Sequence, residues 1–494
     1  MTNPITRRRM LQGAIAAGTT AVTVGPVASA STADTPPAAG SDAIADAIVI
    51  GAGMSGLAAA DDLIRAGKRV VVLEARGRAG GRVHNVVTAG GRTIDGGAEF
   101  VGPTQNAMRD LAHRFDVVAH PTYNEGHSVF WANGQRALFP AELLPLDYSL
   151  PEVARAMAEI DLLCARFPVG EPWRHPQAEY LDGITFEQWV NERVSSPNAR
   201  MLLGLSCSAV LSVRPHEVSA LYMMNYFAAA GDENHPGSFA RLLMVDGGAQ
   251  QEFFDGGAAL IPLRWARTMS AAIVYDAPVR SIAQDATSVR VTTDTGTFTA
   301  RSVIVAMSPA VSSAIDYSPA LPPARDLLSS GYTMGSIAKF VAAYERPWWR
   351  EKGLSGQTIG DGKPVDVTYE SYGEGHSLLM GFISADEMRR LDSASDEQFV
   401  EECTRSFVDY FGPEARDEMI DHGFMKWDAE QWSRGGPVAV AAPGILTSVG
   451  AALREPVGLI HWAGTETADF WTGYMEGAVR SGRRAAAEVL SRPS

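Results

Sequence analysis

Cysteine, basic clusters and long hydrophobic runs are scarce in this chain, and each scarcity argues against a class of function. The 494 residues include three cysteines, Cys164, Cys207 and Cys403, which form no CxxC pair and no Cys/His spacing of a metal site. The ten histidines are scattered along the chain. The sequence therefore predicts neither a disulfide framework nor a metal centre.

Positive charge is also in short supply. The formal net charge is −15, and no basic cluster interrupts the body of the chain, so nucleic acid is not an expected partner. The apolar run of the N-terminal segment is too short to span a membrane and no other stretch reaches transmembrane length, so we expect no stable membrane insertion. With 46% hydrophobic and 20% charged residues, the composition is that of a globular protein, and the length suits two domains.

The first thirty residues have the pattern of an export signal. The segment T-R-R-R-M-L at residues 6–11 resembles a twin-arginine signal, and a mildly apolar run and the cleavage motif Ala28-Ser29-Ala30 follow it. We expect residues 1–30 to direct the folded protein to the twin-arginine export machinery, with cleavage near Ala30. The protein would then reach the periplasm, the cell wall or the medium. Residues 31–43, rich in Pro, Ala and Ser, are expected to form a disordered linker.

The stretch from residue 47 to residue 82 has the pattern of a dinucleotide-binding unit. Two apolar runs, Ala47–Ile50 and Val70–Leu73, predict buried parallel strands, with a helix from residue 57 to 66 between them. Gly51, Gly53 and Gly56 have GxGxxG spacing, which allows a tight turn, the approach of a pyrophosphate and close packing of helix on strand. Glu74 follows the second strand, where a carboxylate accepts hydrogen bonds from ribose hydroxyls.

The end of this unit resembles the flavin amine oxidases, a family that includes monoamine, polyamine and L-amino-acid oxidases. Residues 74–82 read E-A-R-G-R-A-G-G-R, similar to the family's E-A-R-x-R-x-G-G-R, in which the arginine approaches the flavin pyrophosphate. The resemblance implies FAD rather than NAD. It assigns further cofactor contacts to Ser55, Arg76, Gly81 and Arg82.

Later motifs resemble the same family and imply more contacts with FAD. Residues 95–106 resemble the glycine-dense segment beside the flavin ring and place Gly97, Ala98 and Glu99 there. By the same resemblance, Val279 would hold the adenine through its backbone, Trp427 would pack against the flavin and Glu466 would bind flavin hydroxyls. Gly464 precedes that glutamate, and Met475 would lie at the isoalloxazine.

Lys339 and Tyr474 are the catalytic residues that the resemblance implies. Lys339 lies within the apolar pattern G-S-I-A-K-F-V, where burying a lysine is costly unless it has partners. In the family this lysine holds a water near flavin N5 and assists the reaction with oxygen, and the tyrosine is one wall of an aromatic cage that orients the amine. For the substrate cavity we expect Gln250 or Gln251, between which the sequence does not decide, and Trp432.

Two positions depart from the family's pattern. Gly436 stands where mitochondrial monoamine oxidases have the cysteine that links to FAD, so FAD is expected to be non-covalent. Pro437 stands where those enzymes have the second cage tyrosine. The cage is therefore expected to be incomplete, and the substrate preferences of those enzymes do not transfer to this chain.

The segments together predict an α/β fold, with a Rossmann-like FAD-binding domain and an inserted α+β substrate-binding domain, as in monoamine oxidases. We expect residues 44–119, 255–328 and 428–491 in the FAD-binding domain, and residues 120–254 and 329–427 in the substrate-binding domain.

The expected function is FAD-dependent oxidation of a small amine to an imine, with O2 reduced to H2O2. Three alternatives remain: an L-amino-acid oxidase, which needs an arginine facing the substrate carboxylate; a flavin dehydrogenase that passes electrons to another acceptor; and a non-catalytic flavin-binding protein. The sequence leaves open whether the amine is primary, aromatic, cyclic or a polyamine. It also leaves the oligomeric state open, a homodimer being frequent in the family.

Overall fold

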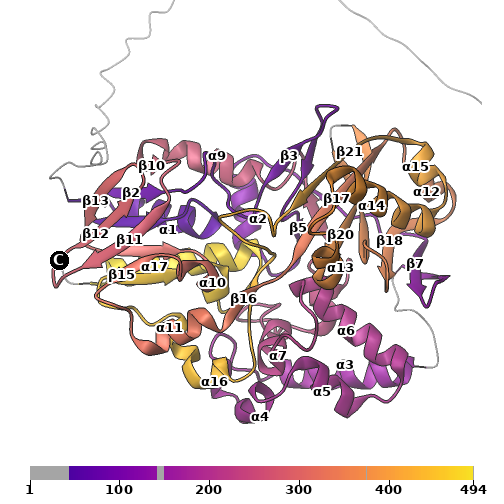
Figure 1. The fold of residues 1–494 in the computed structure, drawn as a ribbon, viewed down its shortest axis with the longest axis horizontal. Coiled ribbons are helices and arrows are strands. Elements are labelled where there is room, and N and C mark those ends of the chain that lie inside the picture. The colour runs from indigo at the N-terminus through magenta and orange to yellow at the C-terminus, as the bar shows by residue number, and fades with distance from the viewer. Residues whose placement is uncertain (1–43, 142–148, 374, 493–494) are drawn as a thin grey trace, which may run out of the picture. The chain divides into compact units, whose positions relative to one another are not determined.

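The computed structural model describes residues 44–141, 149–373 and 375–492. The predicted export signal and linker, residues 1–43, lie outside the described residues and stay predictions. Two large sheets organise the described chain, one parallel and five-stranded, the other mainly antiparallel and seven-stranded (Figure 1).

The parallel sheet gathers strands that lie far apart in the sequence. Its order is β10-β2-β1-β14-β23, and every neighbouring pair is parallel. The strands are β1 (Ala47–Ile50), β2 (Val70–Leu73), β10 (Ile273–Val274), β14 (Val303–Ala306) and β23 (Ile460–Ala463). The bounds predicted for β1 and β2 are confirmed, and the apolar run Val303–Ala306 forms β14. All residues of β1, β2 and β23 are buried, as expected of parallel strands covered on both faces.

Two helices of this region pack unusually closely. Helix α1 (Met54–Arg65) begins three residues before the predicted start, directly after its N-cap Gly53. Helix α17 (Met475–Leu490) crosses it so tightly that a Cβ on Gly482 would lie 2.0 Å from the Ser55 carbonyl oxygen. The Oγ atoms of Ser55 and Ser481 are 3.0 Å apart. The C-terminal helix is therefore fixed against the start of the dinucleotide unit.

The seven-stranded sheet has the order β21-β17-β20-β19-β18-β7-β8. Its strands are β7 (His127–Ala132), β8 (Gln135–Pro140), β17 (Ile337–Tyr344), β18 (Leu354–Gly360), β19 (Val367–Gly373), β20 (His376–Ser384) and β21 (Met419–Lys426). Phe399 and Phe407 of helix α14 (Asp396–Phe411) belong to one apolar cluster with Phe340 of β17, the second strand in this order. Lys339 lies on the opposite face of β17, because successive residues of a strand alternate between faces.

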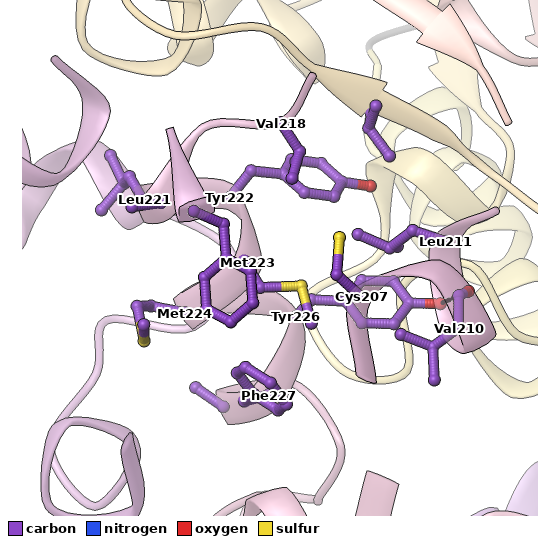
Figure 2. Close-up of a cluster of buried hydrophobic side chains, with 14 of the residues drawn as sticks. Cys207, Val210, Leu211, Val218, Leu221, Tyr222, Met223, Met224, Tyr226 and Phe227 are labelled. Atoms are coloured by element: carbon purple, nitrogen blue, oxygen red, sulfur yellow. Dashed lines mark hydrogen bonds between the residues drawn. The ribbon is translucent and has the colours of Figure 1, made fainter. Parts of the chain in front are cut away.

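A third group consists of helices. It includes α3 (Leu150–Cys164), α5 (Phe186–Arg193), α6 (Pro197–Leu211) and α7 (Ala220–Ala228), which pack side by side (Figure 1). The helical sequence patterns at residues 151–167 and 185–194 correspond to α3, which begins one residue and ends three residues earlier, and to α5, which is one residue shorter at each end. All nine residues of α7 are buried. Figure 2 shows its side chains around Cys207, with Tyr222 and Tyr226 on successive turns and ring centroids 6.2 Å apart.

Smaller elements complete the described chain. Four further sheets contain β11 (Val279–Gln284), β12 (Val289–Thr293), β13 (Gly296–Ala300) and β15 (Asp316–Ser318); β5 (Phe100–Val101), β6 (Ala119–Pro121) and β9 (Glu252–Phe254); β3 (Asn85–Val87) and β4 (Thr93–Asp95); and β16 (Tyr332–Met334) and β22 (Ala439–Ala441). Further helices are α2 (Asn106–Arg114), α4 (Ala178–Asp182), α8 (Phe239–Leu243), α9 (Leu260–Thr268), α10 (Pro309–Ser312), α11 (Pro323–Ser330), α12 (Trp348–Glu351), α13 (Ala385–Arg390), α15 (Glu414–Asp417) and α16 (Ile445–Val449).

The fold is the predicted α/β fold. Three separate segments, residues 47–73, 273–306 and 460–463, supply the parallel sheet, and residues 127–140 and 337–426 supply the seven-stranded sheet. The domain boundaries stay predictions. Within the described residues, no helix combines the length and the apolar composition that a membrane crossing needs.

The turn between β1 and α1 yields a test of local packing. A Cβ on Gly56 would lie 1.8 Å from the Gly51 carbonyl oxygen, whereas a Cβ on Gly53 would meet its nearest protein atom at 3.9 Å. We expect Gly56→Ala to lower the free energy of unfolding by at least about 1–3 kcal/mol, because the backbone at Gly51 must move to make room for the methyl group. Gly53→Ala is the matched control and, when both proteins are free of bound cofactor, should unfold like the natural protein. Equal unfolding midpoints in urea for the two variants would contradict this packing.

Candidate active site

A cavity of about 380 Å³ is lined by segments from nearly the whole described chain. At one end are the β1–α1 turn and the residues after β2. Residues 96–100, Lys339 of β17, the segment from 427 to 437 and the start of α17 also contribute, and Tyr226 comes from α7. The cavity therefore joins the parallel sheet, the seven-stranded sheet and the helical group.

Most of the predicted site residues line this cavity. They are Gly51, Gly53, Ser55, Glu74, Arg76, Gly81, Arg82, Gly97, Ala98, Glu99, Val279, Trp427, Gly464, Met475, Lys339, Tyr474, Gln250 and Trp432. Three others, Gly56, Gln251 and Glu466, do not belong to its lining.

Each of the three has a contact that explains its position. Gly56 packs against the Gly51 carbonyl beneath the turn. Gln251 turns back on its own loop, where its Oε1 accepts a hydrogen bond of 3.0 Å from the Gly247 amide. The choice that the sequence left between two glutamines therefore falls on Gln250 as the cavity residue. Glu466 lies behind Arg82, described below.

The β1–α1 turn fits a phosphate group. Gly53 has an ordinary φ of −73°, and a Cβ there would meet no protein atom closer than 3.9 Å, so protein packing does not explain a glycine. A ligand that approaches the backbone does explain it. No side chain caps the first turn of α1 and no acidic residue lies in it, so its amide groups face the cavity without a competing anion.

Glu74 is held rigidly at the carboxyl end of β2. Its Oε2 accepts from the Ala52 amide at 2.7 Å, and its Oε1 accepts from the Arg76 amide at 2.9 Å. A carboxylate has about four acceptor positions, so each oxygen can still accept from a ligand hydroxyl. The geometry is that expected of a ribose contact.

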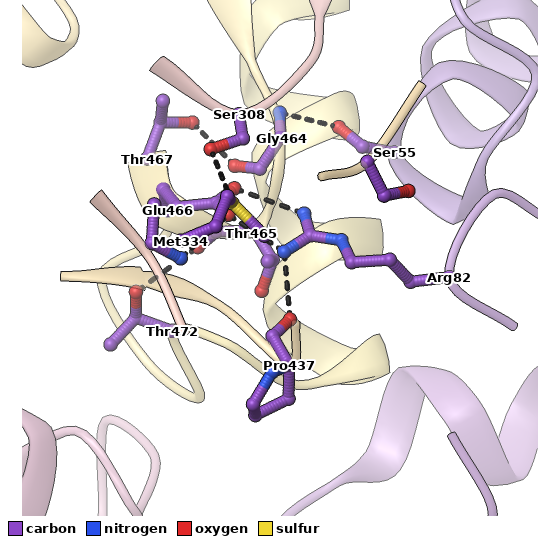
Figure 3. A network of polar contacts seen from close by, with 12 residues as sticks. Ser55, Arg82, Ser308, Met334, Pro437, Gly464, Thr465, Glu466, Thr467 and Thr472 are labelled. Atoms are coloured by element: carbon purple, nitrogen blue, oxygen red, sulfur yellow. Dashed lines mark hydrogen bonds and ion pairs between the residues drawn. The ribbon is translucent and has the colours of Figure 1, made fainter. Parts of the chain in front are cut away.

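Arg82 and Glu466 form a buried ion pair beside the cavity (Figure 3). The Arg82 guanidinium donates to both Glu466 carboxylate oxygens, at 2.8 and 3.2 Å, and to the Pro437 carbonyl at 2.7 Å. Burial alone would raise the pKa of Glu466, but the charge and hydrogen bonds of Arg82 outweigh it and hold that pKa below its usual value. The ion pair joins the segment after β2 to the segment of Glu466, and the hydrogen bond to the Pro437 carbonyl joins it to the segment of Pro437.

Lys339 lies in the middle of β17 and is almost completely buried, with 1% of its surface exposed. Its Nζ donates to the Glu99 carboxylate and, at 3.3 Å, to the Gly97 carbonyl. Phe382 is its direct partner on β20, and Val367 is the partner of Phe382 on β19, so all three side chains point into the cavity from one row. Lys339 thus has the partner that a buried lysine needs.

Aromatic side chains gather around Tyr474. Its ring centroid lies 6.1 Å from that of Tyr226 and 4.9 Å from that of Trp471. Sequence reasoning missed Tyr226, Tyr369 and Phe382, which also line the cavity. The signal for Tyr226 was its place one turn after Tyr222 on α7, but only the fold shows that this turn reaches the cavity.

Gln250 offers a free acceptor in the cavity lining. Its Nε2 donates weakly to the Leu242 carbonyl at 3.4 Å, while its Oε1 is buried and accepts no hydrogen bond in the structure. Buried polar atoms normally have a partner. A ligand N–H group is a suitable partner for this oxygen.

Thiol and imidazole groups do not contribute to the described lining. Cys164, Cys207 and Cys403 are buried elsewhere, and Gly436 lines the cavity where the mitochondrial enzymes have their linking cysteine. Among the residues that the structure describes, no group of three or more His, Cys, Asp or Glu side chains is placed to hold a metal ion.

Comparisons with known proteins agree with this geometry. Residues 54–490 match the family described as flavin containing amine oxidoreductase. The chain is 38% identical to a protein of Mycobacterium tuberculosis named as a flavin-containing monoamine oxidase, over 90% of this chain and 96% of the relative. It is 32% identical to an L-amino acid dehydrogenase of Synechocystis, over 90% and 94%.

Solved structures give the same result. A putrescine oxidase bound to putrescine aligns with a TM-score of 0.86 at 32% identity, covering 91% of this chain and all of that one. Cyclohexylamine oxidase from Brevibacterium oxydans aligns with a TM-score of 0.85 at 32% identity, with the same coverage.

The chain belongs to the flavin-containing amine oxidoreductases. As a member of this family it is an FAD-dependent enzyme that oxidises amines. The cavity fits that cofactor: the β1–α1 turn suits its pyrophosphate and Glu74 a ribose. Gly97, Ala98 and Trp427 line the same cavity, and a Cβ on Gly97 would lie 2.1 Å from the Arg82 carbonyl oxygen and 3.0 Å from the Trp427 ring, so protein packing accounts for that glycine.

The ion pair beside the cavity yields a stability test for this amine oxidoreductase. We expect Arg82→Met to destabilise the protein by about 3–5 kcal/mol, because it leaves the fully buried Glu466 carboxylate without a charged partner. The double variant Arg82→Met/Glu466→Gln removes that uncompensated charge and should recover much of the loss. Urea unfolding at pH 7 measures both. The single variant Glu466→Gln is measured alongside them. If the double variant loses as much free energy of unfolding as Arg82→Met and Glu466→Gln lose together, the pairing is contradicted.

Proposed function

We propose that this enzyme oxidises monoamines whose carbon body carries no second charge, that it holds FAD without a covalent bond, and that it passes the electrons to O2, forming hydrogen peroxide. The observation that carries the substrate class is the state of the charged groups in the cavity lining. Every charged side chain of the described lining except Arg434, which is exposed, already has a hydrogen-bond or ion-pair partner within the protein.

An amino-acid substrate would bring a carboxylate that needs an unpaired cation. Arg82 is bound to Glu466, Arg76 to Glu430 and Ser433, and Arg280 to Asp294. Around Tyr474 and Tyr226 the described lining includes Val210, Leu243 and Ala249, all apolar. Burying a carboxylate among these groups without a partner would be costly. The lining therefore favours an amine over an amino acid.

A diamine or polyamine would bring a second ammonium that needs an unpaired carboxylate. Glu99 is bound to Lys339, and the Glu74 carboxylate is tied to the backbone at the end of β2. A putrescine oxidase is among the related structures, but the described lining of this chain supplies no unpaired carboxylate for a second ammonium. An apolar, aromatic or alicyclic body suits it better.

The chain's own residues then have distinct tasks. Tyr474 and Tyr226 offer apolar faces that hold the amine's body, and Gln250 Oε1 accepts an N–H hydrogen bond from its nitrogen. The dry surroundings favour the neutral amine over its ammonium form, which frees the nitrogen lone pair. FAD, when bound, accepts two electrons and hydrogen from the carbon next to that nitrogen. Lys339 stays a proposed catalytic residue for the reaction with oxygen.

Two further parts of the proposal rest on narrower support. Non-covalent binding is supported by Gly436, which has no thiol, and by the absence of cysteine and histidine from the described lining. Export by the twin-arginine route is supported by the sequence pattern of residues 1–30 alone.

The substrate class can be tested with matched pairs of amines. Phenethylamine and L-phenylalanine differ by one carboxylate, and n-hexylamine and 1,5-diaminopentane differ by one terminal charge at equal length. We expect kcat/KM for peroxide formation to be at least about tenfold higher for the uncharged-body member of each pair, since an unpaired buried charge costs more than 1.4 kcal/mol.

The same assay separates the alternatives. Preference for L-phenylalanine would identify an L-amino-acid oxidase, and preference for the diamine would overturn the proposed substrate class. Turnover with an artificial electron acceptor but without peroxide would identify a dehydrogenase.

A further inference from the structure

The partner of the buried lysine is a feature that the family resemblance did not supply. Lys339 lies on β17, and Glu99 precedes β5 in the glycine-dense segment. Glu99 is 4% exposed and lines the main cavity together with Lys339. Its carboxylate accepts directly from Nζ. The glutamate thus fixes where the ammonium points.

A second carboxyl group belongs to the same cluster. Asp95 ends β4, and its Oδ1 accepts a hydrogen bond of 2.9 Å from the Ala258 amide. Asp95 is half-buried, and two carboxylates beside one ammonium would leave one negative charge uncompensated, which is costly in this environment. Burial and the Glu99 charge accordingly raise the pKa of Asp95 to about 8, against the opposing attraction of Lys339. The cluster therefore keeps one proton at neutral pH.

A small second cavity adjoins this cluster. It encloses about 10 Å³ and is lined by Asp95, Glu99, Ser371 and Tyr372, among others. That volume is close to the space of a single water molecule. Tyr372 is 47% exposed. Glu99 thus lines both the main cavity and this small cavity.

Other charged groups on the surrounding strands do not compete for the proton. They are paired elsewhere: Glu370 with Arg350, Asp421 with Arg92, Lys426 with Asp396 and His376 with Glu345. Burial, followed by the charges of Arg78 and Arg76, lowers the pKa of His84 to about 4, so it is neutral. Burial raises the pKa of Tyr226, Tyr369 and Tyr474 well above the neutral range. These three tyrosines line the main cavity, whereas Tyr372 lines the small cavity.

The proposed reaction needs such a group. It converts R–CH2–NH2 and O2 into R–CH=NH and H2O2, so two electrons and two protons pass from amine to oxygen. Protons must be held within the site between these events and returned to the peroxide. A buried cluster that contains one mobile proton meets this need.

We propose that Glu99 is a positioning residue that holds the Lys339 ammonium and, together with Asp95 on the small cavity, sets the net charge beside the bound flavin. The inference rests on the proposed function for the place of the flavin near Lys339. At pH 7 the cluster is neutral overall. Above about pH 8 Asp95 ionises and the cluster carries one negative charge, which makes reduction of the flavin less favourable.

The test measures the midpoint potential of the bound flavin from pH 6 to pH 9.5 in the natural holoenzyme, in Asp95→Asn and in Glu99→Gln. We expect an additional fall in potential around pH 8 in the natural enzyme and no such step in Asp95→Asn. In Glu99→Gln the carboxyl of Asp95 loses its like-charged neighbour, so the step should move down by at least about one pH unit. Both substitutions keep the shape of the side chain.

The same dependence of the flavin midpoint potential on pH in all three proteins would overturn the inference. A second measurement keeps it separate from the proposed function: the flavin is photoreduced without amine and then exposed to O2. If photoreduced natural enzyme is not reoxidised with formation of peroxide, the oxidase proposal fails, whereas the potential profiles alone decide the role of Glu99.

Discussion

The buried ion pair between Arg82 and Glu466 is the constraint on which the site depends. The Glu466 carboxylate is fully buried and would be costly alone, and Arg82 reaches it only when the segment after β2 and the segment after β23 lie side by side. The Pro437 carbonyl adds a third segment to the same guanidinium. The segment of Arg82 is thereby fixed around one cavity with two segments that lie more than 350 residues later in the sequence, together with the tight contact of α17 on α1.

The cavity has two chemically different kinds of lining. Toward the parallel sheet, charged groups are paired or tied to the backbone, and the β1–α1 turn leaves amides for phosphates. Toward Tyr474 and Tyr226, the described walls are aromatic and aliphatic, with Gln250 Oε1 as an unsatisfied acceptor. The first lining suits a dinucleotide and the second an uncharged body. Lys339 and Glu99 lie within this same lining.

The sequence predicted those parts of the molecule that local pattern determines. Strands β1, β2 and β14 and the GxGxxG turn follow from apolar runs and glycine spacing, and Lys339 stood out as a lysine in an apolar strand. The contacts that depend on long-range packing were out of reach. Only the fold shows that Tyr226 meets Tyr474, that Gln250 rather than Gln251 faces the cavity, and that Glu466 is occupied by Arg82. Likewise, register across β17, β20 and β19 brings Lys339, Phe382 and Val367 into one row.

The central claim is that one cavity holds FAD and an uncharged-body amine and delivers electrons to oxygen. An anaerobic titration of the yellow holoenzyme with phenethylamine, followed by air, tests it most directly. We expect one equivalent of amine to bleach one equivalent of flavin, and air to restore the absorption band with formation of one equivalent of peroxide. A flavin that the amine does not bleach, or a bleached flavin that air does not restore, would contradict it.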